Sequence, residues 1–473
     1  TLSSSSAASD VYKRQIYDLW NRQEKVNVSV RRSEPEFYFK KALNWSATTM
    51  GGSSFRITNN KTSSTAAPSL YFKNDDDLYV SLALLNSCIS QVYMDLLNPT
   101  VGLKLANVEA VPAINFEKMA VFLRSSCENN IALSKEDWDS YEISWDFEQH
   151  PLVKRKELHS LEKCYLTWKT ECENRFLKMK DNEEHINVVI LKEYGLENEV
   201  SCEVPEKSIS VHRIFDTKED IPVSMDGSYY VRTKRDEIVS LISYSVGCMF
   251  GRYSLDKKGI VNAGAPLNVN EYVSFSVDKD NIIPICDDEY FKDDIVGRFV
   301  EFIKIVYGAD SLDDNLTFIA KALGGKGSPR EIIRNYFVND FYKEHCATYS
   351  GTVGKRPIYW LFDAGKNNSF KALIYMHRYQ PDTIARIRTD YVHEQQARYR
   401  TAIADLEQRI ANTSTGERVK LKKKLATLQA QDTEIRTYEE KIHHLADQMI
   451  SINLDDGVKK NYAIFQDVLA KIK

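Results

Sequence analysis

A polar stretch near the start of the chain carries side chains that are well suited to binding nucleic acid. Lysine and arginine can neutralise backbone phosphates, while asparagine and arginine can form paired hydrogen bonds to base edges in the major groove. Both kinds of side chain occur between positions 40 and 61, in a segment rich in Ser, Thr, Gly and Asn. By composition alone the same segment is more typical of a solvated loop. The candidate DNA contacts here are Lys40, Lys41, Ser53, Ser54, Arg56, Asn59, Asn60 and Lys61.

A second basic segment runs from position 355 to position 388. It contains seven Lys or Arg residues and only two acidic residues. Two apolar runs rich in β-branched and aromatic residues, separated by turn-forming residues, predict a β-hairpin over 355–380. A long helix is expected to start just after Pro381, and its first turns carry two further candidate DNA contacts, Arg386 and Arg388.

Two long helices are expected to follow the hairpin. Their apolar residues recur at alternating three- and four-residue steps between charged flanks, which predicts an antiparallel coiled-coil hairpin over 381–450. Such an arm is compatible with spacing DNA-binding parts, with binding a partner and with a purely structural role. The lysines at 420, 422, 423 and 424 make its tip basic, which is also typical of a solvated helix face.

Composition bounds the class of protein. The chain has 473 residues with 43% hydrophobic and 27% charged residues, which is ordinary for a globular protein of about three domains. Its net charge of −4 argues against a uniformly basic nucleic-acid binder, so DNA binding requires local patches. No run approaches the ~18 apolar residues that span a bilayer, so we expect no membrane partner.

The cysteines and histidines of the chain predict no metal site. Eight cysteines are dispersed along the chain, without any C-x-x-C pair or matching histidine pair. In a chain of this size, such dispersion is typical of reduced thiols in a cytosol. We therefore expect a cytoplasmic protein, bacterial or archaeal given the family resemblance described next.

Several long sequence segments resemble the C-terminal part of the PglX family, the adenine-specific DNA methyltransferases of BREX phage-defence systems. They include RPIYWLFDAGKNNSFKALIYMHRY, TIARIRTDYVHEQQ, SYSVGCMFGRYSLDKKG and DNIIPICDDEYFKDDIVGRFVEFIK. The resemblance covers about residues 33–473. It implies a parent enzyme that methylates adenine N6 with S-adenosylmethionine, double-stranded DNA as substrate, and a target-recognition role for 34–115. Other BREX proteins are possible partners, and a non-catalytic scaffold that binds them is the alternative function.

The motifs of the catalytic domain are absent from the sequence. An adenine-N6 methyltransferase needs [DNS]-P-P-[YFW], which holds the amino group of the flipped base and stacks on its ring. The nearest stretch, at 98–101, lacks the second proline and the aromatic residue. A glycine-rich turn for S-adenosylmethionine is missing too. We expect no catalytic, cofactor-binding or metal-binding residue here, and an inactive fragment that binds no cofactor.

The expected fold class is α+β and predominantly helical. Residues 1–15 resemble translated sequencing adapter, and 16–33 are expected to be a linker remnant. The expected order after these is a target-recognition-like domain (34–115), a mostly helical middle region (116–354), the β-hairpin (355–380), the helical hairpin (381–450) and a C-terminal helix (451–473).

Overall fold

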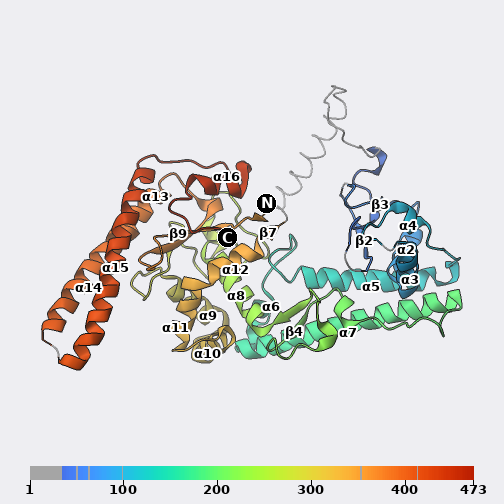
Figure 1. Ribbon diagram of the computed structural model, residues 1–473, viewed down its shortest axis with the longest axis horizontal. Coiled ribbons are helices and arrows are strands. Elements are labelled where there is room, and N and C mark those ends of the chain that lie inside the picture. The colour runs from blue at the N-terminus through green and yellow to red at the C-terminus, as the bar shows by residue number, and fades with distance from the viewer. Residues whose placement is uncertain are drawn as a thin grey trace, which may run out of the picture. The chain divides into compact units, whose positions relative to one another are not determined.

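The computed structural model describes residues 35–49, 52–61, 64–98, 100–351, 354–412 and 414–472 (Figure 1). The predictions for 1–15 and 16–33 lie outside these residues. The fold is predominantly helical with several small sheets, as expected. The described chain forms two compact units, which we call the N-terminal unit (35–138 and 169–233) and the C-terminal unit (139–168 and 234–472). The predicted domain boundaries stay predictions.

The N-terminal unit is built around a small antiparallel sheet and the helices packed on it. The sheet has the strand order β2-β1-β3, and Trp45 and Phe55 belong to the apolar core that the helices complete. A second, smaller core forms around Phe176 and Met179. The elements are β1 (Ala42–Trp45), β2 (Phe55–Thr58), β3 (Ser69–Leu70), α2 (Asp75–Asn86), α3 (Cys88–Leu97), α4 (Leu105–Glu109), α5 (Ala120–Trp138), most of α7 (Leu161–Tyr194), β4 (Arg213–Phe215) and β5 (Val231–Thr233).

The C-terminal unit is organised around the predicted β-hairpin, which is present as β9 (Tyr359–Asp363) and β10 (Lys371–Tyr375). Strand β6 (Ile283–Pro284) pairs with the other edge of β10. Trp360 and Ile374 lie in the apolar cluster formed with the C-terminal helices. On the opposite face Tyr359 stacks on Phe250, with 5.4 Å between ring centroids. Both faces are therefore buried, which explains the uninterrupted apolar runs.

The helices of the C-terminal unit surround this sheet. The predicted pair of long helices is present as α14 and α15, which pack against each other (Figure 1); a coiled-coil geometry stays a prediction. The remaining bounds are α6 (Pro151–Lys154), α8 (Lys234–Met249), α9 (Ile295–Tyr307), α10 (Leu312–Leu323), α11 (Pro329–Asn339), α12 (Phe341–Thr348), β7 (Ser350–Gly351), β8 (Gly354–Lys355), η7 (Met376–Arg378), α13 (Thr383–Arg386), η8 (Ile387–Val392), α14 (His393–Ala411), α15 (Thr415–Ala446) and α16 (Gly457–Ile464).

Two local expectations are wrong. Apolar residues spaced three and four apart over 76–97 predict one helix, but the helix breaks at Ser87. The Ser87 hydroxyl donates to the Leu84 carbonyl at 2.6 Å, and it also caps α3. Trp138 and Trp145 are expected to be packing anchors, with base stacking as the alternative, and their exposed fractions of 51% and 75% contradict the packing role. Neither indole is buried, because both residues lie where a helix or loop faces solvent.

Within the described residues, no single helix is long and apolar enough to cross a bilayer. Taken together, α2 and α3 have the necessary length and composition, but they are bent by 69° relative to each other. Both helices place apolar side chains, such as Leu82 and Ile89, in the core of the N-terminal unit.

Candidate nucleic-acid interface

The predicted DNA contacts of the N-terminal unit lie on and beside the β2-β1-β3 sheet. Strands β1 and β2 pair antiparallel, with Asn44 opposite Arg56. Because side chains alternate between the faces of a strand, Trp45 and Phe55 point into the core while Asn44 and Arg56 lie on the other side. We call this other side the outer face.

The outer face is held together by a polar row that crosses all three strands. The Thr58 hydroxyl of β2 donates to the side-chain oxygen of Asn44, and the Asn44 amide donates to the Ser69 hydroxyl of β3. The same amide also donates to the Pro68 carbonyl at 3.2 Å. Asn44 is buried, and its hydrogen bonds fix the strands that carry the exposed cations.

Three cations at this sheet have no ion-pair partner among the described residues. Lys40, Arg56 and Lys61 are exposed, and in the part of the chain that the structure describes none of them makes an ion pair. The Phe39 amide donates to the Lys61 carbonyl at 3.2 Å, which joins the chain before β1 to the chain after β2. The ends carrying Lys40 and Lys61 are therefore neighbours.

The amide and hydroxyl candidates divide between the two ends of the β1-β2 pair. Asn59 and Asn60 are exposed at the end that carries Lys61, and Asn60 adopts a left-handed conformation with φ of 57°. Asparagine tolerates this conformation better than most residues. Ser54 is exposed at the opposite end. The structure thus groups Lys40, Asn59, Asn60 and Lys61, with Arg56 on the adjoining strand.

Lys41 and Ser53 have structural partners instead. The Lys41 ammonium pairs with the Asp75 carboxylate at 2.8 Å and lies 4.7 Å from the centre of the Tyr79 ring. Partial burial acts to lower the pKa of Lys41, but hydrogen bonds to Asp75 and Tyr79 outweigh it and raise the pKa above the ordinary value. The Ser53 amide donates to the Gln91 side chain at 3.2 Å. Both residues attach the sheet to helices α2 and α3.

Arg386 and Arg388 belong to the C-terminal unit and each has a carboxylate partner. Arg386 pairs with Asp382 at 2.7 Å, and Arg388 pairs with Glu439 of α15 at 2.6 Å. The first pair has the i,i+4 spacing that sequence inspection can detect, whereas the second joins residues far apart in the chain. Neither arginine offers a free charge, so the structure adds no support to their predicted DNA contact.

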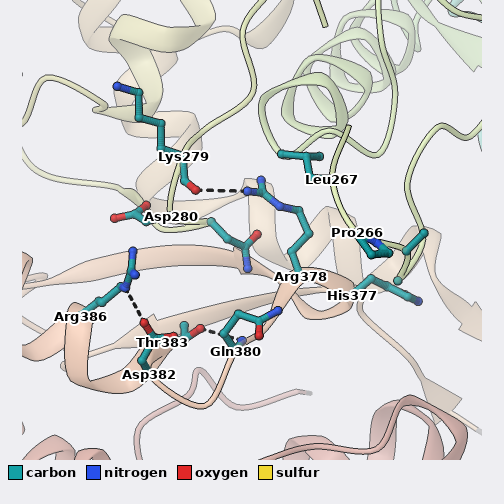
Figure 2. A pocket seen from close by; sticks show the side chains of 13 residues that line it. Pro266, Leu267, Lys279, Asp280, His377, Arg378, Gln380, Asp382, Thr383 and Arg386 are labelled. Carbon is teal, nitrogen blue, oxygen red and sulfur yellow. Dashed lines mark hydrogen bonds and ion pairs between the residues drawn. The ribbon is translucent and has the colours of Figure 1, made fainter. Parts of the chain in front are cut away.

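Arg386 also lines a pocket of about 470 Å³ between the start of α13 and the loop before β6 (Figure 2). The Arg378 guanidinium crosses its wall and donates to the carbonyls of Phe250 (3.2 Å) and Asp278 (2.9 Å). Lys279 and Asp280 come from the facing loop. Cationic and acidic groups alternate around the pocket, so no single ligand charge is favoured.

A cluster of carboxylates beside this pocket was not anticipated from the sequence. Oxygen atoms of Asp278, Asp280 and Asp293 lie within 4.8 Å of one another. The Tyr391 hydroxyl lies 2.9 Å from Asp280 and 2.6 Å from Asp293. Burial, followed by the charge of Asp280, raises the pKa of Asp278 to about 7.

This cluster is the place where a hard cation would find oxygen ligands. The sequence predicts no metal site, and the cluster by itself does not call for one, because the Tyr391 hydroxyl and a shared proton relieve the repulsion. The acidic run Asp287-Asp288-Glu289 is predicted to complement the dipole at the start of a helix, with a magnesium site as the alternative. Asp288 pairs with Arg398 and Glu289 pairs with Arg330, so these acids serve ion pairs rather than the start of α9.

Over most of its length the chain is similar to curated adenine-specific methyltransferases, although no family model matches it. The chain is 37% identical over 438 residues to the adenine-specific methyltransferase PglX of Lacticaseibacillus casei (strain Zhang), covering 90% of this chain and 34% of that protein. It is 33% identical over 469 residues to the adenine-specific methyltransferase BrxX of Escherichia coli O9:H4 (strain HS), covering 96% of this chain and 38% of that protein. The chain thus spans little more than a third of the relatives it matches. The resemblance predicted from the sequence is confirmed.

Proposed function

We propose that the chain is the DNA-recognition and C-terminal region of a site-specific DNA N6-adenine methyltransferase of BREX phage defence. Its similarity to adenine-specific methyltransferases supports a parent enzyme of that class. We further propose that the parent acts on double-stranded DNA and lies in the cytoplasm. In this proposal the S-adenosylmethionine-dependent chemistry belongs to another part of the parent. This region recognises the target sequence and binds the duplex, and it binds no cofactor of its own.

One observation carries the proposal: Lys40, Arg56 and Lys61 are exposed cations without an acidic partner among the described residues, in a chain whose net charge is −4. An unpaired cation at a surface keeps its full charge for phosphates, whereas a paired one must first give up its partner. The neighbouring amides of Asn59 and Asn60 can donate to base edges and accept from them. Cations that bind phosphates fix the position of a protein on the duplex, and amides that bond to base edges distinguish one base sequence from another. A recognition surface needs both kinds of contact.

Duplex binding at several salt concentrations tests the proposal. We expect the triple substitution Lys40→Ala, Arg56→Ala and Lys61→Ala to weaken binding by at least about tenfold near 100 mM salt. If each side chain contacts one phosphate, the slope of log K against log salt should shrink by about 2 to 3. Fluorescence anisotropy with a labelled duplex measures both quantities.

A matched control removes three exposed cations elsewhere in the same unit, Lys118, Lys178 and Lys192, each replaced by alanine. The control should bind nearly as well as the original chain. Equal weakening by both triple substitutions would contradict the proposed interface. Failure of the unmodified chain to bind duplex even at low salt would instead favour the alternative function, a scaffold that binds other BREX proteins.

A further inference from the structure

The tip of the α14–α15 pair carries an exposed group of lysines that the interface above does not use. The two helices lie side by side, and the turn that joins them is at the end far from α13 (Figure 1). Leu421 is buried against the partner helix, and Leu425 is half-buried. We define the basic tip as the exposed residues Arg418, Lys420, Lys422, Lys423 and Lys424.

Acidic residues are scarce near the basic tip along the chain, and the nearest is Glu417 directly before it. No acidic residue occurs between positions 418 and 431. In the part of the chain that the structure describes, Lys420, Lys422, Lys423 and Lys424 make no ion pair. Further along the same helix, by contrast, Arg436 pairs with Asp432 at 2.6 Å.

The spacing of these lysines also destabilises helix α15, which carries them. Lys420 and Lys424 are four residues apart, and Lys420 and Lys423 are three apart, so their like charges are neighbours on the helix surface. Among the residues that the structure describes, neither packing nor ion pairing accounts for these lysines, whereas a bound polyanion would relieve their mutual repulsion.

We propose that the basic tip is a second binding surface for the phosphate backbone of duplex DNA, independent of base sequence. The inference rests on the proposed function, because it takes duplex DNA as the substrate. Lys420 and Lys424 are about 6 Å apart along the helix axis, and duplex DNA carries one charge per ~1.7 Å of its length. Several phosphates can therefore meet the lysines at once.

The side-chain types of the tip fit backbone contact rather than base reading. Four of its five residues are lysines, flexible point charges without the planar donor pair that arginine uses on guanine. The Nε of the single arginine, Arg418, donates to the Ile410 carbonyl at 3.2 Å. The basic tip contains no asparagine or glutamine. It can therefore add affinity without adding a preference for one base sequence.

The test uses the full chain with Lys420, Lys423 and Lys424 replaced by alanine. Binding to a duplex of arbitrary sequence should weaken by about tenfold or more near 100 mM salt, with the slope of log K against log salt reduced by about 2 to 3. The ratio of affinities for two duplexes of different sequence should not change. The variant should also fold, because alanine favours the helix and removes repulsion, so its melting temperature should not fall.

The matched control replaces Lys321, Lys366 and Lys441, three exposed lysines of the same unit, with alanine. If the tip variant binds duplex like this control while the unmodified chain binds well, the inference is overturned and the proposed function stands. If the tip variant weakens binding but the Lys40, Arg56 and Lys61 variant does not, the sheet interface is wrong and the tip stands. A chain that binds no duplex overturns both.

An acidic protein is the competing partner for the tip. Poly-L-glutamate serves as the probe, measured with the same three variants. Loss of poly-L-glutamate binding in the tip variant, with duplex binding retained, would assign the tip to an acidic protein and overturn the DNA inference.

Discussion

Lys40 and Lys41 are adjacent in the chain but have opposite surroundings. Lys41 points to the core side of β1, where Asp75 and Tyr79 of α2 receive its charge. Lys40 is exposed and makes no ion pair with any residue that the structure describes. Both residues precede β1, and only the position of α2 supplies the carboxylate that pairs with Lys41. Membership of a basic stretch therefore does not decide whether a cation is available to DNA.

Asp278 gives a residue-scale prediction about pH. Its pKa is raised from about 3.8 when unfolded to about 7 when folded, so the folded chain holds a proton that the unfolded chain has lost between these values. The stability of the fold should therefore fall as pH rises from 4 to 7. Asp278→Asn removes this loss, which amounts to at most about 4 kcal/mol.

Thermal melts of both proteins from pH 5 to pH 8 measure the effect. Asp278→Asn should flatten the pH dependence and raise the melting temperature above that of the original chain at pH 8. Asp280→Asn should flatten it in part, because Asp280 is the nearby charge that raises the pKa of Asp278. Identical pH slopes for the original chain and Asp278→Asn would refute the assignment.

At the scale of elements, two similar local signals have different outcomes. Ser328, with Pro329 and Glu331, is predicted to start a helix, and the structure has this capping box at α11. Ser134 is also predicted as a cap, but it lies within α5, which continues to Trp138. Leu123 and Leu133 of α5 are buried in two different clusters, so tertiary packing carries the helix past the local signal.

The break at Ser87 gives an element-scale prediction. Because the Ser87 side chain caps α3 and is buried, Ser87→Ala should lower the free energy of unfolding by about 1 to 2 kcal/mol. Ser134→Ala is the control, and it should be neutral or slightly stabilising, since alanine has the higher propensity inside a helix. Urea denaturation of the original chain and the two variants measures these free energies. An equal decrease in the free energy of unfolding for both variants would show that Ser87 does not stabilise α3 as a cap.

At the scale of the whole molecule, the chain returns to each unit after leaving it. Residues 35–138 and 169–233 form one unit, and 139–168 and 234–472 form the other. Helix α7 contributes residues to both. Each unit has its own apolar core, one around Trp45 and one around Trp360. Consecutive segments of sequence are therefore not the same as cooperative units of folding.

Separate cores predict separate unfolding transitions. Leu82→Ala should lower the melting temperature of one calorimetric transition, and Ile374→Ala should lower that of the other, because each removes about 2 to 5 kcal/mol from its own core. Each variant is the control for the other. A single transition that both substitutions lower equally would mean that the two units unfold together.

Local sequence patterns were enough to predict several elements and the family resemblance. Apolar runs around a turn predicted β9 and β10, periodic residues predicted the pair α14 and α15, and long phrases predicted the homology to adenine-specific methyltransferases. Apolar runs, periodic spacing and turn residues depend only on residues close together in the chain, so the sequence alone reveals them. Only the tertiary structure decided that Arg388 is paired with Glu439, that Trp145 is exposed, and that Tyr391 contacts Asp280 and Asp293. Charge neutralisation and burial depend on residues distant in the chain, and no local pattern records which distant residues meet.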